Sequence, residues 1–498
     1  MKPYLILIFL FSVFLFLFIV TVLFPEEGIH IGNNIHLRFT SIHDILEKDT
    51  VKYADISSIL QNSEVSREVE ETEDTTELIK PEEIEIPQEL IPEVKDTVVF
   101  NPDSIKRLIN PIELPPLNPA VLYPVFNDLH SLSKTKKLIR LLHYGDSQIE
   151  GDRITSYVRN KLQHLFGGSG CGLLAPVPLD HGLVSIKQKY SDNWVRFPGY
   201  LIQNKDLGHK RYGALMSFSR QDIPESDPNT FKTSWLSFAP TNMGYRNART
   251  FSKVSLFLTN LNDTVTLKVK NQGSLISTRK LLPASSLTEL SWKFKKTPKE
   301  LVFTFEGKGI TEIYGVSFDS PWGVAVDNIP LRGSSGLVFS RIDTVFLLNM
   351  YKKLNVRMLI LQFGGNIVPL NADDYKFYEK YFLRELNIIK RLLPGVPVIV
   401  IGPSDMSLKK DDSYITYPNL TKVRDAMKNA AFISGYAFWD MYEAMGGENS
   451  MPSWVYADPP LAVPDFVHFN LRGTKIIAEM FYNAFLSEYN KWLNERNS

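Results

Sequence analysis

A short apolar stretch that runs into a polar turn places the strongest constraint on how this chain folds. Residues 138–144, Leu-Ile-Arg-Leu-Leu-His-Tyr, are typical of a buried β-strand, and Gly145-Asp146-Ser147-Gln148 is typical of a tight turn. Apolar residues then recur at helical spacing from Ile154 to Phe166, with Asp152 placed to cap the helix and Gly167-Gly168 to end it. Strand, turn and helix in this order predict the first unit of an α/β domain.

The same alternation of strand and helix resumes far downstream. Strand-like runs are expected at Gly323–Ile329, Val356–Phe363, Val396–Ile401 and Tyr436–Asp440, and helices at Tyr375–Leu393, Leu420–Phe432 and Leu471–Asn494. Strands that alternate with helices predict a parallel sheet covered on both faces, in a flavodoxin-like α/β arrangement. Catalytic groups in such folds lie on loops at the carboxyl ends of the strands.

The segment between these two parts has a different pattern. From about residue 184 to 320, short alternating apolar segments are separated by turns such as Asn271-Gln-Gly and Glu306-Gly-Lys-Gly. Many short strands with little helix predict a β-sandwich. Because the α/β pattern continues afterwards, the sandwich is expected to be an insertion within the α/β domain.

The N-terminus is long and apolar enough to cross a membrane. The apolar run from Tyr4 to Phe24 has about the 20 residues that a bilayer-spanning helix needs, and no small-residue cleavage site follows it. Lys2 precedes the run and Glu26-Glu27 follows it, so the positive-inside rule predicts a single-pass anchor with the bulk of the chain outside the cytoplasm.

Composition narrows the class of partner. The 55 lysines and arginines balance 55 aspartates and glutamates, which argues against nucleic acid as a partner. A single cysteine, Cys171, excludes an intrachain disulfide and a cysteine-based zinc cluster. Thirteen acids against three bases between Glu64 and Asp96, with three prolines, predict an extended acidic spacer.

Four loops at predicted strand ends carry groups that suit nucleophilic catalysis. They hold Ser147, then Arg332-Gly333-Ser334-Ser335-Gly336, then Gly364-Gly365-Asn366, and finally Asp465 with His468. A serine hydroxyl needs a base to remove its proton, and a carboxylate commonly orients that base. Asp465 and His468 lie three residues apart and can supply the pair, whereas the competing acids Asp440 and Asp458 lack that spacing to a histidine. No metal cluster or cofactor-binding motif stands out, so no metal and no cofactor is expected.

Taken together, these motifs resemble the SGNH (GDSL-type) hydrolase superfamily over residues about 130–185 and 320–490. The resemblance implies that Ser147 is the nucleophile and that Asp465 and His468 are the acid and base. It also implies an oxyanion hole made by the main-chain N–H groups of Ser147 and Gly333 and the amide of Asn366, with Gly336 as a substitute for Gly333. Many relatives carry an acid directly after the asparagine, and here Ile367 stands there instead.

A closer resemblance is to the peptidoglycan O-acetylesterase-like branch, in which the first motif reads much like Gly145-Asp-Ser-Gln-Ile-Glu-Gly-Asp152 and a sandwich similar to carbohydrate-binding modules is inserted. The expected organisation is therefore a membrane anchor at 1–27, an extracytoplasmic segment with the acidic linker at 28–98, hydrolase parts at 99–183 and 321–498, and the inserted sandwich at 184–320.

Three functions remain open at this point. The first is a membrane-anchored extracytoplasmic, or periplasmic, serine esterase that removes O-acetyl groups from a cell-wall or other polysaccharide. The second is an acyltransferase that moves acetyl groups onto a glycan with the same triad, with a membrane acyl-transfer partner. The third is a non-enzymatic glycan-binding protein that uses the sandwich alone. Two roles are open for the sandwich residues Trp194, Trp235 and Trp292: they stack on sugar rings, or they pack in the core.

Overall fold

The protein was analysed as a computed structural model, which describes residues 3–25, 29–30, 36–37, 51–63, 110–178, 185–201, 207–222 and 230–498. The chain divides into two units, Met1–Lys52 and Tyr53–Ser498. In the first unit, helix α1 (Pro3–Leu23) is apolar along its whole length, and Tyr4–Leu23 is long enough to cross a membrane with a mean hydropathy of 3.2. Strands β1 (Ile29–His30) and β2 (His36–Leu37) pair after it. The predicted apolar N-terminal helix is confirmed, and the predicted acidic spacer lies outside the described residues.

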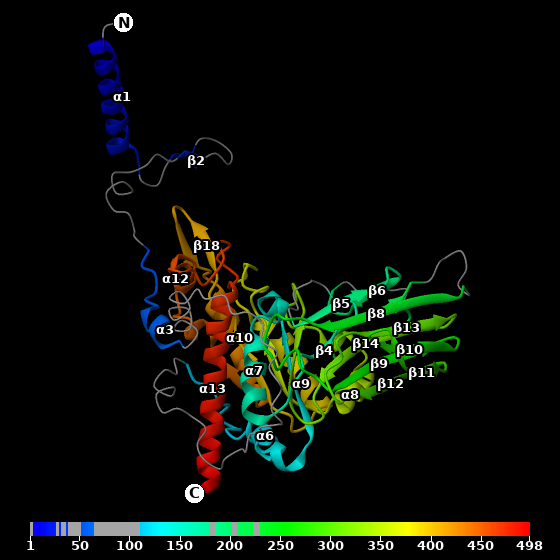
Figure 1. Cartoon of the computed structure of the whole chain (residues 1–498). Helices are drawn as coiled ribbons and strands as arrows, with labels where there is room; N and C mark the ends of the chain where they lie inside the picture. The colour runs from blue at the N-terminus through cyan, green and yellow to red at the C-terminus, as the bar shows by residue number, and fades with distance from the viewer. Residues whose placement is uncertain are drawn as a thin grey trace, which may run out of the picture. The chain divides into compact units, whose positions relative to one another are not determined.

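A five-stranded parallel sheet forms the centre of the second unit (Figure 1). Its strands, in spatial order, are β15 (Gly323–Pro330), β3 (Leu138–Gly145), β16 (Val356–Gln362), β17 (Val398–Ile401) and β20 (Ala437–Trp439). Within this sheet, β3 comes first in the chain, and it is flanked by β15 on one side and β16 on the other. This is the flavodoxin-like order, and it creates a topological switch point at the carboxyl end of β3. The predicted parallel sheet is confirmed.

Helices cover both faces of this sheet. One group consists of α6 (Tyr123–Thr135), α7 (Thr155–Phe166) and α13 (Leu471–Asn497), and the other of α8 (Thr344–Leu354), α9 (Lys376–Leu392) and α10 (Leu420–Ser434). The predicted helices are thus confirmed to within a few residues, whereas α6 and α8 were not predicted. Shorter elements are α3 (Ser57–Asn62), η1 (Ser147–Asp152), η3 (Phe339–Arg341), β18 (Ser407–Lys410), β19 (Ser413–Thr416), α11 (Met441–Ala444) and α12 (Ser450–Tyr456).

One local prediction about α7 is wrong. Asp152 does not cap the helix, because residue 154 occupies the N-cap position and no side chain caps it. The Asp152 carboxylate instead forms a buried ion pair with Arg159, with an oxygen 2.5 Å from a guanidinium nitrogen. An unpaired buried guanidinium would cost more free energy than an uncapped helix end, so the carboxylate pairs with Arg159. The helix does end at Gly167, as predicted.

The inserted segment forms a β-sandwich, as predicted. One antiparallel sheet has the order β11-β10-β13-β8-β5 and the other β12-β9-β14-β7-β6, with β4 pairing on β14. Their bounds are β4 (Gly172–Leu174), β5 (Ile186–Tyr190), β6 (Trp194–Pro198), β7 (Ser217–Gln221), β8 (Lys232–Pro240), β9 (Lys253–Leu261), β10 (Val265–Asn271), β11 (Ser274–Leu281), β12 (Ala284–Lys293), β13 (Leu301–Gly307) and β14 (Ile310–Asp319). Trp194 and Trp292 are buried in the core between the sheets, which leaves them unable to stack on an external sugar.

The sandwich and the parallel sheet are joined by buried charges. Arg140, on β3, donates to Asp327 on β15 at 2.7 Å and to Asp319 at the end of β14 at 2.6 Å. All three side chains are almost fully buried. A buried pair that loses one partner leaves an uncompensated charge. The strand that leads into the Ser147 turn is therefore held to the sandwich by an interaction that neither part can make alone.

The short segment at residues 53–63 also belongs to the second unit. Helix α3 and the residues before it pack on α12 and the loop that precedes it: the Ala54 N–H donates to Asn449 O at 3.2 Å, and Ser453 Oγ donates to Ala54 O at 2.6 Å. Ile56 and Ile59 are buried in the same core as the parallel sheet. Residues 53–63 thus contribute to the core although 46 residues separate them from Asn110, where the described chain resumes.

Candidate active site

The turn that contains Ser147 follows β3 at the switch point of the sheet. Ser147 is the first residue of η1, where main-chain N–H groups have no intrahelical acceptor. Asp146 caps η1 by accepting from the N–H of Gln148 at 3.0 Å. Gly145 is required by close packing, because a Cβ there would lie 3.0 Å from the carbonyl oxygen of Gln362 on β16. The turn therefore presents the serine directly above the end of the strand.

Ser147, His468 and Asp465 lie in a continuous hydrogen-bonded chain. Ser147 Oγ is 2.9 Å from His468 Nε2, and His468 Nδ1 is 2.7 Å from Asp465 Oδ2. The other oxygen of Asp465 accepts from the main-chain N–H groups of Val467 and His468 at 2.9 and 3.0 Å. One carboxylate thus holds both the loop and the imidazole ring, which is the arrangement of a serine nucleophile with its base and orienting acid.

The two carboxylates of the site have opposite pKa shifts. Partial burial of Asp465 works against ionisation, but hydrogen bonds from the His468 main chain, the His468 ring and Val467 outweigh it and lower its pKa. Burial raises the pKa of Asp146 to about 6, against the hydrogen bond from Gln148 and the nearby His468, which both lower it. Asp465 is therefore the carboxylate that stays ionised beside the imidazole, as an orienting acid must.

The expected oxyanion donors are placed unequally. Asn366 lines the pocket that contains Ser147, and its Nδ2 donates to Ser334 O at 3.1 Å, which leaves the second amide proton for a ligand. Gly333 adopts a φ of +75° on the same loop as Ser334 but does not line the pocket. The N–H of Gly336 donates to Ser334 Oγ at 3.1 Å, so that this glycine is already engaged and does not replace Gly333.

A pocket of about 300 Å³ opens beside Ser147 and His468. It is lined by Asp146, Ser147, Gln148, Gln362, Phe363, Gly365, Asn366, Pro369, Pro403, Ser404, Met406, Tyr417, Met441, Val467 and His468. No role was predicted from the sequence for the wall formed by Pro403, Ser404 and Met406. The sequence did carry a signal for this wall. Its residues directly follow a predicted strand, and in parallel sheets the loops at strand ends form the site.

Other chemically capable residues lie elsewhere or are already paired. Asp440 caps α11 and contacts Arg424, so it is not the acid of this site. His143 is buried between Thr155 and Gln362, and burial lowers its pKa to about 4. Burial also raises the pKa of Cys171. Within the described residues, no group of histidine, cysteine and acidic side chains could hold a metal ion.

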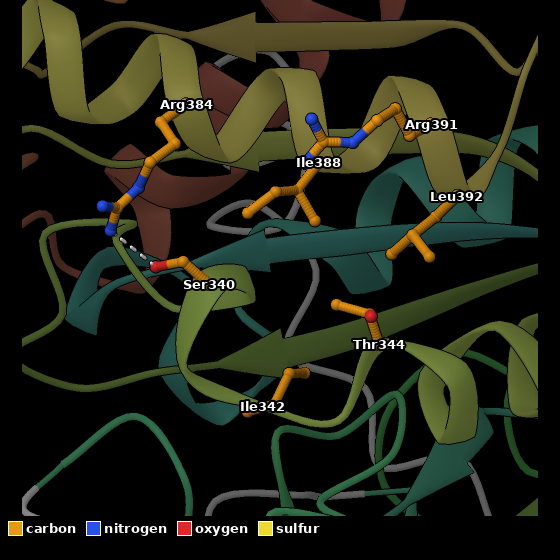
Figure 2. Close-up of a pocket in the computed structure, with 7 residues that line it drawn as sticks. All are labelled: Ser340, Ile342, Thr344, Arg384, Ile388, Arg391 and Leu392. Carbon is orange, nitrogen blue, oxygen red and sulfur yellow. Dashed lines mark hydrogen bonds between the residues drawn. The ribbon is translucent and has the colours of Figure 1, made fainter.

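A second hollow, of about 470 Å³, lies between α9 and the start of α8 (Figure 2). Figure 2 shows Arg384, Ile388 and Arg391 on one side, facing Ser340 and Thr344 on the other. Arg384 donates to Ser340 Oγ at 3.0 Å. This hollow shares no lining residue with the pocket at Ser147 and contains no pair of nucleophile and base.

Comparison with known proteins identifies the fold. No family model and no curated protein matches the sequence. Among solved structures, a peptidoglycan O-acetylesterase is 21% identical, covers 74% of this chain and 96% of its own, and has a TM-score of 0.59. A salicylyl-acyltransferase from a tetracycline biosynthetic pathway (14% identity, 59% and 95% coverage, TM-score 0.25) and a family two carbohydrate esterase from Clostridium thermocellum (10%, 54% and 98%, TM-score 0.23) are too distant in structure to carry an argument.

The protein therefore has an SGNH hydrolase-like α/β fold with an inserted β-sandwich. The predicted fold class is confirmed. The solved structure that supports it is a peptidoglycan O-acetylesterase, and the first motif of this chain resembles that same branch.

Proposed function

We propose that the protein is a serine esterase that removes small acyl groups, acetyl above all, from a glycan. The observation that carries the proposal is the chain of hydrogen bonds from Ser147 through His468 to Asp465 at the mouth of a pocket. The fold similarity to a peptidoglycan O-acetylesterase supports an acetylated cell-wall polysaccharide as the substrate. The reaction needs no cofactor or metal, because the serine, the base and the oxyanion donors supply the whole of an acyl transfer.

In the proposed mechanism, Ser147 is first acylated and then deacylated. Ser147 Oγ attacks the ester carbonyl carbon while its proton passes to His468 Nε2. The carbonyl oxygen becomes an oxyanion, which receives hydrogen bonds from the N–H of Ser147 and from Asn366 Nδ2, with the N–H of Gly333 as a predicted third donor. The bond to the sugar oxygen then breaks, His468 returns the proton to that oxygen, and an acyl-serine remains. Water attacks the acyl-serine and gives a proton to His468; the bond to Ser147 Oγ then breaks, His468 returns the proton to that oxygen, and acetic acid leaves and ionises to acetate. Asp465 holds the imidazole tautomer throughout.

We further propose that α1 anchors the enzyme in a membrane with the catalytic unit outside the cytoplasm. The helix has the length and apolarity of a membrane span, and the charges around it favour this orientation. Acetylated wall polysaccharide lies on that side of the membrane, so the proposed anchor holds the enzyme on the same side as its proposed substrate.

Replacing the nucleophile tests the proposal. We expect Ser147→Ala to lower kcat for p-nitrophenyl acetate and for O-acetylated peptidoglycan by at least about 10³-fold, because no other group forms the acyl-enzyme. Acetate release by the full-length protein in detergent is the measurement, and Ser340→Ala, which changes an exposed serine at the other hollow, is the control.

Unchanged turnover by Ser147→Ala would exclude the triad. Acylation of an added glycan without release of acetate would indicate a transferase instead. Glycan binding by a protein that releases no acetate and transfers no acyl group, and that binds equally well as Ser147→Ala, would favour the non-enzymatic alternative.

A further inference from the structure

Among the described residues, hydrogen bonds from side chains connect the two halves of the candidate site. We call residues 146–153 the nucleophile turn and residues 463–470 the histidine loop. In the part of the chain that the structure describes, no main-chain hydrogen bond joins them, and the bonds that do are made by Ser147, Gln148 and Arg153. The parallel sheet therefore brings the two segments to one edge without fixing the distance between them.

Gln148 makes the first of these connections. Its Nε2 donates to the carbonyl oxygen of Val467 at 2.7 Å and to Ser404 Oγ at 3.3 Å. The side chain is 7% exposed, and its own main-chain N–H is held by Asp146. Val467 directly precedes the candidate base, so this bond fixes the main chain on one side of His468.

Arg153 makes the second connection. Its Nε donates to Glu150 O at 2.8 Å and one terminal nitrogen donates to Ser147 O at 2.7 Å, both within the nucleophile turn. The other terminal nitrogen donates to Phe469 O at 3.3 Å, directly after His468. A guanidinium has five N–H donors in one rigid plane, so a single side chain can fix all three carbonyl groups relative to one another.

Two further carbonyl groups of the histidine loop, next to those on Val467 and Phe469, are held by main-chain groups. Phe466 O accepts from the N–H of Ser407 at 2.9 Å, and His468 O accepts from the N–H of Val463 at 2.9 Å. The four consecutive carbonyl groups from Phe466 to Phe469 are thus all engaged. The two that flank the base, on Val467 and Phe469, are the two that the nucleophile turn holds.

We infer that Gln148 and Arg153 are positioning residues that set the distance between Ser147 Oγ and His468 Nε2. The inference rests on the proposed function, because it assigns these two residues a task only if Ser147 and His468 react together. Proton transfer needs the base within hydrogen-bond reach of the hydroxyl, and a misplacement of about 1 Å costs about 100-fold in rate.

The test is steady-state kinetics of Gln148→Ala and Arg153→Ala, with active sites counted by labelling to completion with a fluorophosphonate. We expect kcat per labelled site for p-nitrophenyl acetate to fall about 10- to 100-fold, with KM within about twofold of the parent value. Arg153→Lys should recover part of the loss, since it keeps a donor. The double variant should lose less than the product of the two single losses, because both act on the same Ser147–His468 contact.

Two matched controls separate positioning from general loss of packing. Gln163→Ala removes a buried glutamine whose Nε2 donates to Gly170 O at 3.0 Å, and Arg196→Ala removes a half-buried arginine that donates to Val177 O at 3.2 Å. Both should keep the parent kcat per labelled site.

The outcomes also separate this inference from the proposed function. If Ser147→Ala is inactive but Gln148→Ala and Arg153→Ala keep the parent kcat per labelled site, the inference is wrong and the esterase proposal stands. Equal losses in the two controls, or exactly multiplicative losses in the double variant, would likewise overturn it. Activity in Ser147→Ala would instead remove the proposed function itself.

Discussion

Asn366 is the residue whose side chain the proposed mechanism uses only where an oxyanion develops. One of its amide protons is already donated to Ser334 O, and this bond fixes the plane of the amide next to Ser147. The second proton therefore points at a fixed place rather than being free to rotate. Such a preorganised donor stabilises the developing oxyanion more than the neutral ester, so its contribution belongs to kcat.

Removing this donor gives a prediction at the residue scale. Asn366→Ala should lower kcat about 10²- to 10³-fold, equivalent to about 2.7–4 kcal/mol, with little change in KM. Asn366→Asp keeps the shape but has no N–H when ionised, so it should lose at least as much. Initial rates of acetate release measure the effect, and an Asn366→Ala enzyme with unaltered kcat would remove this residue from the oxyanion hole.

The residues of the candidate site are also where sequence reasoning reached furthest. Ser147, His468, Asp465 and Asn366 were all named from their motifs. The structure brings Ser147, His468 and Asn366 to one pocket and places Asp465 in hydrogen-bond contact with His468. Gly333 lies on the expected loop but away from the pocket lining, and its part in the oxyanion hole stays a prediction. Gln148 and Arg153 were not singled out, because their partners are main-chain carbonyl groups more than 300 residues away, which no local pattern can reveal.

At the scale of elements, the histidine loop is supported by two segments that interrupt the α/β pattern. The hairpin of β18 and β19 places Tyr414 flat against Phe466, with ring centroids 3.5 Å apart and an interplanar angle of 8°. Tyr456 of α12 packs edge-on against the same phenylalanine at 5.6 Å and also contacts Tyr53 at 6.0 Å. Residues 53–63 thus reach, through two aromatic rings, the loop that carries His468.

Truncating a core residue of α3 tests whether this segment is part of the folded unit. Ile59 is 3% exposed, so Ile59→Ala should lower the free energy of unfolding by about 2–5 kcal/mol, through lost burial and the cavity left behind. Its exposed neighbour Ser58 provides the control, and Ser58→Ala should stay within about 0.5 kcal/mol. Thermal or denaturant unfolding measures both. An Ile59→Ala protein as stable as the parent would show that residues 53–63 do not pack on the catalytic unit.

At the scale of the whole molecule, a buried carboxylate ties the sandwich together where it meets the helices. Glu312 on β14 accepts hydrogen bonds from Thr259 and Tyr314 and pairs with Arg220 at 2.5 Å. Tyr314 in turn packs against Phe346 of α8, with ring centroids 4.5 Å apart. Burial opposes ionisation of Glu312, but hydrogen bonds from His209, Tyr314 and Arg220 outweigh it and lower its pKa to about 2.

The depressed pKa gives a pH dependence of stability with a definite sign. The carboxylate is favoured in the folded state, so its contribution is present above the ordinary pKa of 4.5 and is lost as the pH falls from there through about 2. The contribution at neutral pH is roughly 3 kcal/mol. Glu312→Gln should be less stable at pH 7 and should lose less stability than the parent between pH 4.5 and 2.

The control for this prediction is an acid on the surface of the same sandwich. Glu306 forms a partly exposed pair with Lys268, and Glu306→Gln should stay within about 1 kcal/mol of the parent at pH 7. Denaturant unfolding at a series of pH values measures all three proteins. Equal pH dependence in the parent and Glu312→Gln would show that this carboxylate is not held in its charged form by folding.

The sequence by itself determined the periodic elements, because each β-strand and helix of the α/β part carries its own apolar pattern and turn signals. It also determined the insertion and the identity of the candidate catalytic residues, because a strand-end motif is local in the chain. Only the tertiary structure decided what holds these parts together: the Arg140 ion pairs, the packing of residues 53–63, and the Gln148 and Arg153 bridges. Such contacts join residues that are distant in the chain through single side chains and main-chain carbonyl groups, and these leave no period in the sequence.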